Sequence, residues 1–203
     1  RRKPRQHSVS NKFYDKNSDY YGLSSLALGF MAGQLHHIKA MNAVMNPLVN
    51  SYKRLVVGYE APVNAAWGQR NRSALMRIPR VTPAMSAKAT RVELRCPDPS
   101  SNPYLTFAVM LAAGMDGIKK GMTCPEPIED NIWELTDEEM KAKGITTVAK
   151  SLEDALEHLK NNEVIRGALG EHFFHKFYEA KTAECDEYRM HVSSWEHDRY
   201  LNY

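Results

Sequence analysis

The stretch 24–47, SSLALGFMAGQLHHIKAMNAVMNP, decides the fold prediction. Its apolar residues recur at helical spacing, a serine pair is available to cap the first turn, and Pro47 cannot continue a helix. The stretch therefore predicts a long helix over 24–46, with His36 and His37 near its polar side. Adjacent histidines on a helix do not face one ligand, which argues against a metal role for this pair.

A second apolar helix is predicted after residue 100. Asn102 is a suitable N-cap, and Pro103 suits the first helical position because the N–H that it lacks would have no partner there. Gly121 marks the expected end of the helix. Because most residues in this stretch are apolar, we expect the helix to be largely buried.

Two helices are expected toward the end of the sequence. Ser151 and Asp154 resemble a capping box and predict a helix over 152–160. A last helical stretch is predicted over 171–200.

The composition is that of a soluble globular protein: 203 residues, 43% hydrophobic and 25% charged, with a mean hydropathy of −0.52. The apolar stretches are too short or too interrupted for a bilayer span. Three scattered cysteines predict neither a disulfide framework nor a zinc site, so we expect a reducing, cytoplasmic location. No membrane partner is therefore expected, and because the 27 Lys and Arg nearly balance the 24 Asp and Glu, no nucleic-acid partner is expected either.

Residues 48–100 have the glycines, prolines and short β-branched or aromatic runs of strands and loops, and many arginines. From Lys53 to Arg95 the only acids are Glu60 and Glu93. Converging guanidiniums suit a polyphosphate or an amino-acid substrate, and exposed arginines paired with distant acids are the alternative. The arginines are Arg54, Arg70, Arg72, Arg77, Arg80, Arg91 and Arg95.

The segment 91–95, RVELR, sharpens this prediction. A strand period places Arg91, Glu93 and Arg95 on one face and the apolar residues between them on the other. The Glu93 carboxylate then belongs either to a salt-bridge ladder or to a Mg²⁺ or Mn²⁺ site beside phosphates. The spacing of the residues in the sequence does not distinguish between these two alternatives. Glu60, on a loop bounded by Gly and Pro, is either a mobile proton acceptor or merely solvated.

Two longer runs carry a resemblance to a known family. They are NPLVNSYKRLVVGYEAPVNAAWGQRNRSALMRIPR over 46–80 and KATRVELRCPDPSSNPYLTFAVMLAAGMDGI over 88–118. The chain resembles type I glutamine synthetase, in the C-terminal part of its catalytic domain. The resemblance extends upstream to FYDKNSDYYGLSS and downstream to SSWEHDRYLNY. It implies an α+β fold with a curved antiparallel sheet and backing helices.

The resemblance also implies an activity and a set of site residues. The activity is ATP-dependent ligation of ammonia to glutamate through γ-glutamyl phosphate, with two Mg²⁺ or Mn²⁺ ions in a complete site. The implied roles are glutamate binding for Arg54, Glu60 and Arg95, proton acceptance for Glu60, phosphoryl contact for Arg72, ATP binding for Arg72, Arg77, Lys88 and Arg91, and metal binding for Glu93.

The resemblance covers 11–203 and implies like subunits in a dodecamer of two hexameric rings. Residues 1–10 form an atypical basic segment, expected to be a gene-model artefact or else a basic arm. The family's N-terminal β-grasp domain and the first half of its catalytic domain are not matched, so we expect a fragment that is inactive alone. The alternatives are a γ-glutamyl-amine ligase on the same scaffold, or a non-catalytic remnant that assembles with full-length subunits.

Overall fold

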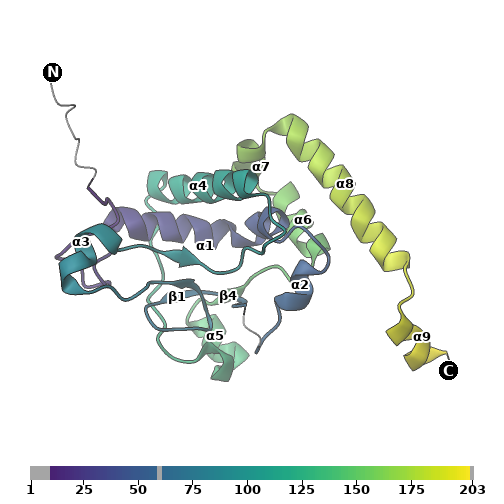
Figure 1. Ribbon diagram of the computed structural model, residues 1–203, viewed down its shortest axis with the longest axis horizontal. Coiled ribbons are helices and arrows are strands. Elements are labelled where there is room, and N and C mark those ends of the chain that lie inside the picture. The colour runs from purple at the N-terminus through teal and green to yellow at the C-terminus, as the bar shows by residue number, and fades with distance from the viewer. Residues whose placement is uncertain (1–9, 59–60, 202–203) are drawn as a thin grey trace, which may run out of the picture. The chain divides into compact units, whose positions relative to one another are not determined.

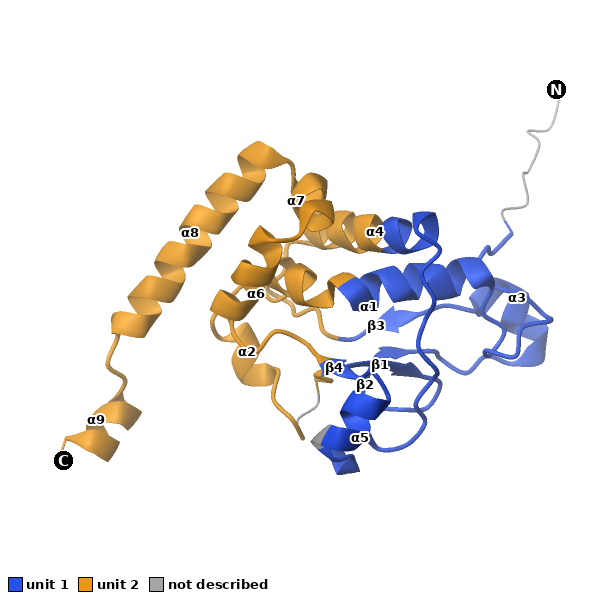
Figure 2. Cartoon of the chain, turned by 180° about the vertical axis from the view of Figure 1, so that it is seen from behind, with its two compact units in different colours: residues 1–36, 64–95, 114–146 blue, residues 37–63, 96–113, 147–203 orange. Residues whose placement is uncertain are grey.

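The computed structural model describes residues 10–58 and 61–201. Helices and short strands follow one another along the chain (Figure 1). The chain divides into two compact units, which Figure 2 shows in different colours. Unit 1 comprises Arg1–His36, Asn64–Arg95 and Gly114–Thr146, and unit 2 comprises His37–Val63, Cys96–Ala113 and Thr147–Tyr203.

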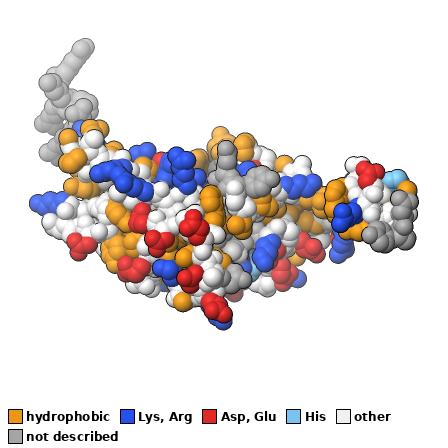
Figure 3. Space-filling view, turned by 90° about the horizontal axis from the view of Figure 1, so that it is seen from below, with side chains coloured by type: hydrophobic (Ala, Val, Ile, Leu, Met, Phe, Trp, Pro, Cys, Tyr) orange, Lys and Arg blue, Asp and Glu red, His pale blue; other side chains and the backbone are white. Residues whose placement is uncertain are grey.

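The mixture of helices with a sheet confirms the predicted α+β class. Within the described ranges, no helix combines the length and the apolar character needed to cross a membrane. Figure 3 shows basic and acidic side chains interspersed over one face. The α-helices are α1 (Ser25–Met45), α2 (Ser51–Arg54), α3 (Ser86–Ala89), α4 (Pro103–Lys119), α5 (Asp137–Ala142), α6 (Leu152–Lys160), α7 (Glu163–Leu169), α8 (Glu171–Met190) and α9 (Ser194–Tyr200), with 3₁₀ turns at Pro83–Met85 and Ile132–Glu134.

The strands form one sheet in the order β3-β2-β1-β4. They are β1 (Asn64–Gly68), β2 (Ala74–Arg77), β3 (Glu93–Leu94) and β4 (Thr146–Thr147). β2 and β3 are antiparallel, with Arg77 opposite Glu93, whereas β1 and β2 are parallel. The parallel pair differs from the antiparallel sheet that the resemblance implied. The loop 69–73 returns the chain to the start of β1, so that β2 runs in the same direction beside it.

The core of unit 1 is built around the two parallel strands. Every residue of β1 is buried, and Trp67, Leu75 and Met76 are fully enclosed. A strand buried on both faces requires apolar residues without alternation, which explains the run Ala65, Ala66 and Trp67 within it. The sheet therefore offers a rigid support for the loop that joins its two central strands.

The predicted helix over 24–46 is confirmed by α1. Its first turn is capped by Ser24, whose Oγ accepts a hydrogen bond from the Ala27 N–H at 3.2 Å, and it ends two residues before Pro47. The expected position of His37 on a polar side is wrong, because this side chain is only 4% exposed. Its Nδ1 lies 2.8 Å from the side-chain nitrogen of Asn162, so a polar partner allows its burial.

The predicted second helix is confirmed in its limits but not in its burial. Asn102 caps α4, accepting from the Tyr104 N–H at 3.0 Å, and Gly121 follows its end at a φ of 61°. However, Tyr104 is 85% exposed and Phe107 is 67% exposed. Only one face of α4 is covered, so an apolar composition on every side did not lead to burial on every side. The buried residues on the covered face are Thr106, Val109 and Ala113.

The two late helices give one confirmed and one corrected prediction. α6 has the predicted limits, and Ser151 Oγ accepts from the Asp154 N–H at 3.0 Å. The single stretch predicted over 171–200 is wrong, because α8 ends at Met190 and α9 begins at Ser194. Ser193 and Glu196 form a reciprocal capping box that starts the new helix. This Ser-x-x-Glu pattern marks the start of a separate helix, although the apolar residues on both sides of it keep a helical spacing.

We predict opposite effects of alanine at two glycines. At Gly117 a Cβ atom would lie 2.2 Å from the carbonyl oxygen of Gly29 and 2.5 Å from the nitrogen of Gly33, so α1 and α4 would have to move apart. Gly117→Ala should destabilise the protein by about 1–3 kcal/mol. Gly167→Ala, inside α7 with nothing within 4 Å of its Cβ, should stabilise by about 0.4–1 kcal/mol.

Urea unfolding of both variants beside the unchanged chain measures these effects through the transition midpoint. Equal stability of the Gly117→Ala variant and the unchanged chain would contradict the close helix approach, and Gly167→Ala controls for the helix propensity of alanine.

Candidate active site

Unit 1 brings together four of the arginines around one carboxylate. This arginine cluster consists of Arg72, Arg77, Arg91 and Arg95 with Glu93. Arg77 comes from the end of β2, Glu93 from β3, and Arg72 from the loop 69–73. The sheet thus gathers residues that are up to 23 positions apart in the sequence.

Glu93 lies between two guanidinium groups. Its Oε2 accepts from Arg77 Nε at 2.9 Å and from Arg77 Nη2 at 2.6 Å, and its Oε1 accepts from Arg91 Nη2 at 3.2 Å. The antiparallel register produces the first pair, because it places Arg77 opposite Glu93. The side chains of Arg77 and Glu93 are 42% and 30% exposed, so both stay open to a ligand.

Arg95 is positioned by the backbone rather than by Glu93. Its Nη1 donates to the carbonyl oxygen of Arg72 and, at 3.4 Å, to that of Ala74. Burial lowers the pKa of Arg95, and the charges of Arg77 and Arg72 lower it further, while Glu93 acts in the opposite direction. The cluster therefore holds more positive charge than its single carboxylate offsets, which favours an anionic ligand.

The loop 69–73 is held by a buried asparagine. Asn71 is 5% exposed, and its side-chain nitrogen donates to the carbonyl oxygens of Ile128 at 2.8 Å and Asp130 at 2.7 Å. Its Oδ1 accepts from the Ser73 N–H at 2.8 Å, and Ser73 Oγ accepts from the Ile132 N–H at 3.1 Å. This support was not predicted from the sequence, although asparagine and serine in a short turn are its usual signal.

Glu129 holds the other end of the loop. It accepts from the N–H groups of Gln69 at 2.7 Å and Arg70 at 3.2 Å, and from the Tyr21 hydroxyl at 2.7 Å. Burial raises the pKa of Glu129, but the hydrogen bonds from Gln69, Tyr21 and Arg70 outweigh it, so that the pKa lies below its usual value. Asn71 and Glu129 together fix the backbone that presents Arg72.

Tyr21 is strained where it meets Glu129. Its φ of 56° is left-handed, a conformation that bulky residues rarely adopt. Burial raises the pKa of Tyr21 to about 12, with a further contribution from the hydrogen bond to Glu129, and the ring packs edge-on against Trp67 at a centroid distance of 5.9 Å. These contacts offset the backbone strain.

Two other predicted site residues are not part of the cluster, and a third is not described by the structure. Arg54 belongs to unit 2, where its Nη2 donates to the carbonyl oxygen of Cys96 and its Nε is buried with no partner among the described residues. Lys88 is exposed on the short helix α3. Glu60 lies outside the described residues.

The expected salt-bridge ladder is present in a changed form. Glu93 is flanked by Arg91 and Arg77 rather than by Arg91 and Arg95. As a metal ligand, Glu93 would supply one carboxylate, which suits Mg²⁺ when phosphates and waters complete the octahedron. Among the residues that the structure describes, no group of three or more His, Cys, Asp or Glu is placed to hold a metal ion.

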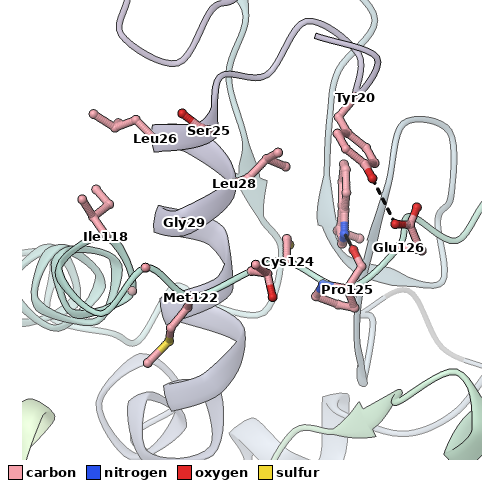
Figure 4. Close-up of a pocket in the computed structure, with 14 residues that line it drawn as sticks. Tyr20, Ser25, Leu26, Leu28, Gly29, Ile118, Met122, Cys124, Pro125 and Glu126 are labelled. Carbon is pink, nitrogen blue, oxygen red and sulfur yellow. Dashed lines mark hydrogen bonds between the residues drawn. The ribbon is translucent and has the colours of Figure 1, made fainter.

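A cavity of about 780 Å³ lies in unit 1 beside the start of α1 (Figure 4). The Tyr20 hydroxyl donates to Glu126 Oε1 at 3.0 Å on one wall, and the Trp67 Nε1–H donates to the Pro125 carbonyl oxygen at 2.6 Å. None of the residues lining this cavity belongs to the arginine cluster. The cavity and the arginine cluster are therefore separate features of unit 1.

The fold and the cluster define an α+β domain with an excess of guanidinium groups beside its sheet. The chain matches the family model described as glutamine synthetase, catalytic domain, over residues 6–200. The chain therefore belongs to the glutamine synthetase family.

Individual relatives agree with this assignment. The chain is 53% identical to the glutamine synthetases of Methanocaldococcus jannaschii and Thermus thermophilus, over 94% of its own length and 41% or 42% of theirs. The chain thus spans about two fifths of the length of these relatives. A solved structure of apo GmaS without ligand has a TM-score of 0.77 at 34% identity, with 95% of this chain and 42% of that chain covered.

We predict that Glu129→Gln destabilises the protein by about 1 kcal/mol near neutral pH, because the amide replaces a charged acceptor of three hydrogen bonds. A carboxyl whose pKa is lowered by folding stabilises the native state above its ordinary value of 4.5 and loses this contribution as the pH falls through the lowered pKa.

The difference in unfolding free energy between the unchanged chain and the variant should accordingly shrink below about pH 4.5. Urea titrations at pH 7 and at a series of acidic values measure it. A difference that does not change with pH would contradict the role of the ionised carboxylate.

Proposed function

We propose that this chain supplies part of the active site of a glutamate–ammonia ligase, which makes glutamine from glutamate, ammonia and ATP. The observation that carries the proposal is the arginine cluster around Glu93 in a chain of the glutamine synthetase family. Its excess positive charge suits the phosphates of ATP and the carboxylates of glutamate. The family's general use of ATP and a divalent metal agrees with these residue types.

The chemistry proceeds in two balanced steps. The γ-carboxylate of glutamate attacks the γ-phosphorus of ATP, which forms γ-glutamyl phosphate and releases ADP. Ammonia then attacks the acyl carbon, phosphate leaves, and a proton is transferred to a base. Phosphoryl transfer depends mainly on positioning and on neutralising the charge spread over the phosphoryl oxygens. Guanidiniums fixed in advance provide both.

Within this scheme, each residue has a proposed role. Arg72 contacts the transferred phosphoryl group, for which its fixed loop is suited because Asn71 and Glu129 hold the backbone. We assign ATP contacts to Arg77, Lys88 and Arg91, and glutamate binding to Arg54, Glu60 and Arg95. Glu60 is the proposed proton acceptor, and a loop carrying it would also exclude water from the acyl phosphate. When a divalent cation is bound, it supplies further charge neutralisation, with Glu93 as one ligand.

The complete site needs more than these 203 residues in this proposal. The relatives are more than twice as long as the matched region, and the remaining length would supply further metal ligands and the rest of the substrate sites. Assembly of like subunits into a dodecamer, and a cytoplasmic setting, belong to the same proposal.

A chimera tests the proposed roles. Residues 11–203 replace the matching part of the Thermus thermophilus relative, to which this chain is 53% identical. We expect the chimera to form glutamine from glutamate, ATP and ammonia. Arg72→Ala in the chimera should lower kcat by about 10³-fold, the magnitude known for arginines that stabilise a transferred phosphoryl group.

Arg80→Ala is the matched control, because Arg80 is an exposed arginine of the same segment that lies outside the cluster. Glutamine formation at an unchanged kcat in the Arg72→Ala chimera would contradict the proposed phosphoryl contact of Arg72. Competition between ammonia and methylamine in the same assay separates a glutamine synthetase from a γ-glutamyl-amine ligase. The 203-residue chain alone should form no glutamine, and turnover by it would contradict the proposed need for further residues.

A further inference from the structure

Tyr21 keeps a strained backbone conformation for which the fold alone gives no reason. Its φ is 56°, and among the described residues it is the only residue other than glycine in the left-handed region. A bulky residue stays in such a conformation only when its surroundings enforce it. Strained residues of this kind gather at functional sites, so the contacts of Tyr21 indicate what the strain serves.

The backbone on both sides of Tyr21 is held by hydrogen bonds. The Asp15 N–H donates to the Gly22 carbonyl oxygen at 2.9 Å, and the Leu23 N–H donates to the Tyr20 carbonyl oxygen at 2.9 Å. A change of Tyr21 to an ordinary conformation would disturb both bonds. The side chain of Tyr21 therefore leaves the backbone in one fixed direction.

This direction brings the Tyr21 hydroxyl to Glu129. Tyr21 Oη donates to Glu129 Oε1 at 2.7 Å. The same oxygen accepts from the Gln69 N–H at 2.7 Å, and Glu129 Oε2 accepts from the Arg70 N–H at 3.2 Å. One carboxylate thus joins Tyr21 to the backbone at the start of the loop 69–73.

Glu129 needs such a partner because it is exposed. A glutamate at the surface samples several rotamers, and only some of them reach the two N–H groups of the loop. A donor that is fixed by its own backbone favours the rotamer that holds the loop. The hydroxyl of Tyr21 is this donor.

The loop 69–73 carries Arg72, so the contacts of Tyr21 lead to the candidate active site. We propose that Tyr21 is a positioning residue for phosphoryl transfer, which acts through Glu129 on the loop that carries Arg72. The inference rests on the proposed function, because it needs Arg72 to contact the phosphoryl group. All of these residues belong to unit 1.

Tyr20 provides a matched control for Tyr21. Its ring also packs against Trp67, at a centroid distance of 6.1 Å, and its hydroxyl donates to Glu126 Oε1 at 3.0 Å (Figure 4). In the part of the chain that the structure describes, Glu126 makes no hydrogen bond to the loop 69–73. Tyr20→Phe and Tyr21→Phe therefore each remove one hydroxyl and keep one ring, and only the second change touches the support of the loop.

Amide hydrogen exchange on the 203-residue chain, followed by NMR, tests the structural step without reference to catalysis. In Tyr21→Phe, the Gln69 and Arg70 amides should exchange about fivefold faster, the factor expected for the loss of one net hydrogen bond. Tyr20→Phe should leave both rates unchanged. Unchanged rates in a folded Tyr21→Phe chain, or an equal acceleration by Tyr20→Phe, would overturn the proposal.

Kinetics of the chimera test the catalytic step. Tyr21→Phe should lower kcat by about tenfold, part of the loss of about 10²-fold that a misplacement of about 1 Å causes. Tyr20→Phe should leave kcat unchanged. In the Arg72→Ala background, Tyr21→Phe should lower kcat no further, because the group that it positions is gone.

This double-mutant comparison separates positioning from a merely structural role. A loss of folded protein would lower kcat by the same factor in both backgrounds, so a further tenfold fall beside Arg72→Ala would contradict the inference. An unchanged kcat in Tyr21→Phe, with a large loss in Arg72→Ala, would overturn the inference and leave the proposed function intact. An unchanged kcat in Arg72→Ala would overturn both.

Discussion

The register between β2 and β3 is the constraint on which the candidate site depends. It sets Arg77 opposite Glu93, so the guanidinium donates twice to one carboxylate oxygen while Arg91 approaches the other. A slip of one residue would turn alternate side chains to the opposite face and remove this arrangement. The buried residues of β2 oppose such a slip, since Leu75 and Met76 are fully enclosed.

The same sheet determines how Arg72, the proposed phosphoryl contact, is presented. β1 and β2 are parallel, so their short connection must run back along the pair, and it carries Arg72. A loop of this kind would be mobile without support. Asn71 and Glu129 provide it through bonds to backbone groups, which leaves the arginine side chains available for a ligand.

Local sequence signals predicted the helices well and the contacts between distant segments poorly. Ser24, Asn102 and Ser151 each cap a helix as expected, because a cap depends on residues within one turn. The exposure of Tyr104 and Phe107 on α4 depends on which face other segments cover, which periodicity does not encode. Likewise, spacing placed Arg95 on the same face as Glu93, whereas the tertiary structure directs Arg95 to the carbonyl groups of Arg72 and Ala74.

We propose that the arginine cluster, with Glu93 at its centre, binds phosphates and a cation. A crystal structure of the chimera with ADP and Mn²⁺ tests it most directly, because anomalous scattering locates the metal. We expect a Mn²⁺ ion about 2 Å from a Glu93 carboxylate oxygen, with ADP phosphate oxygens beside Arg77 and Arg91. A structure in which Glu93 keeps only its arginine partners, with metal and phosphates bound elsewhere, would contradict it.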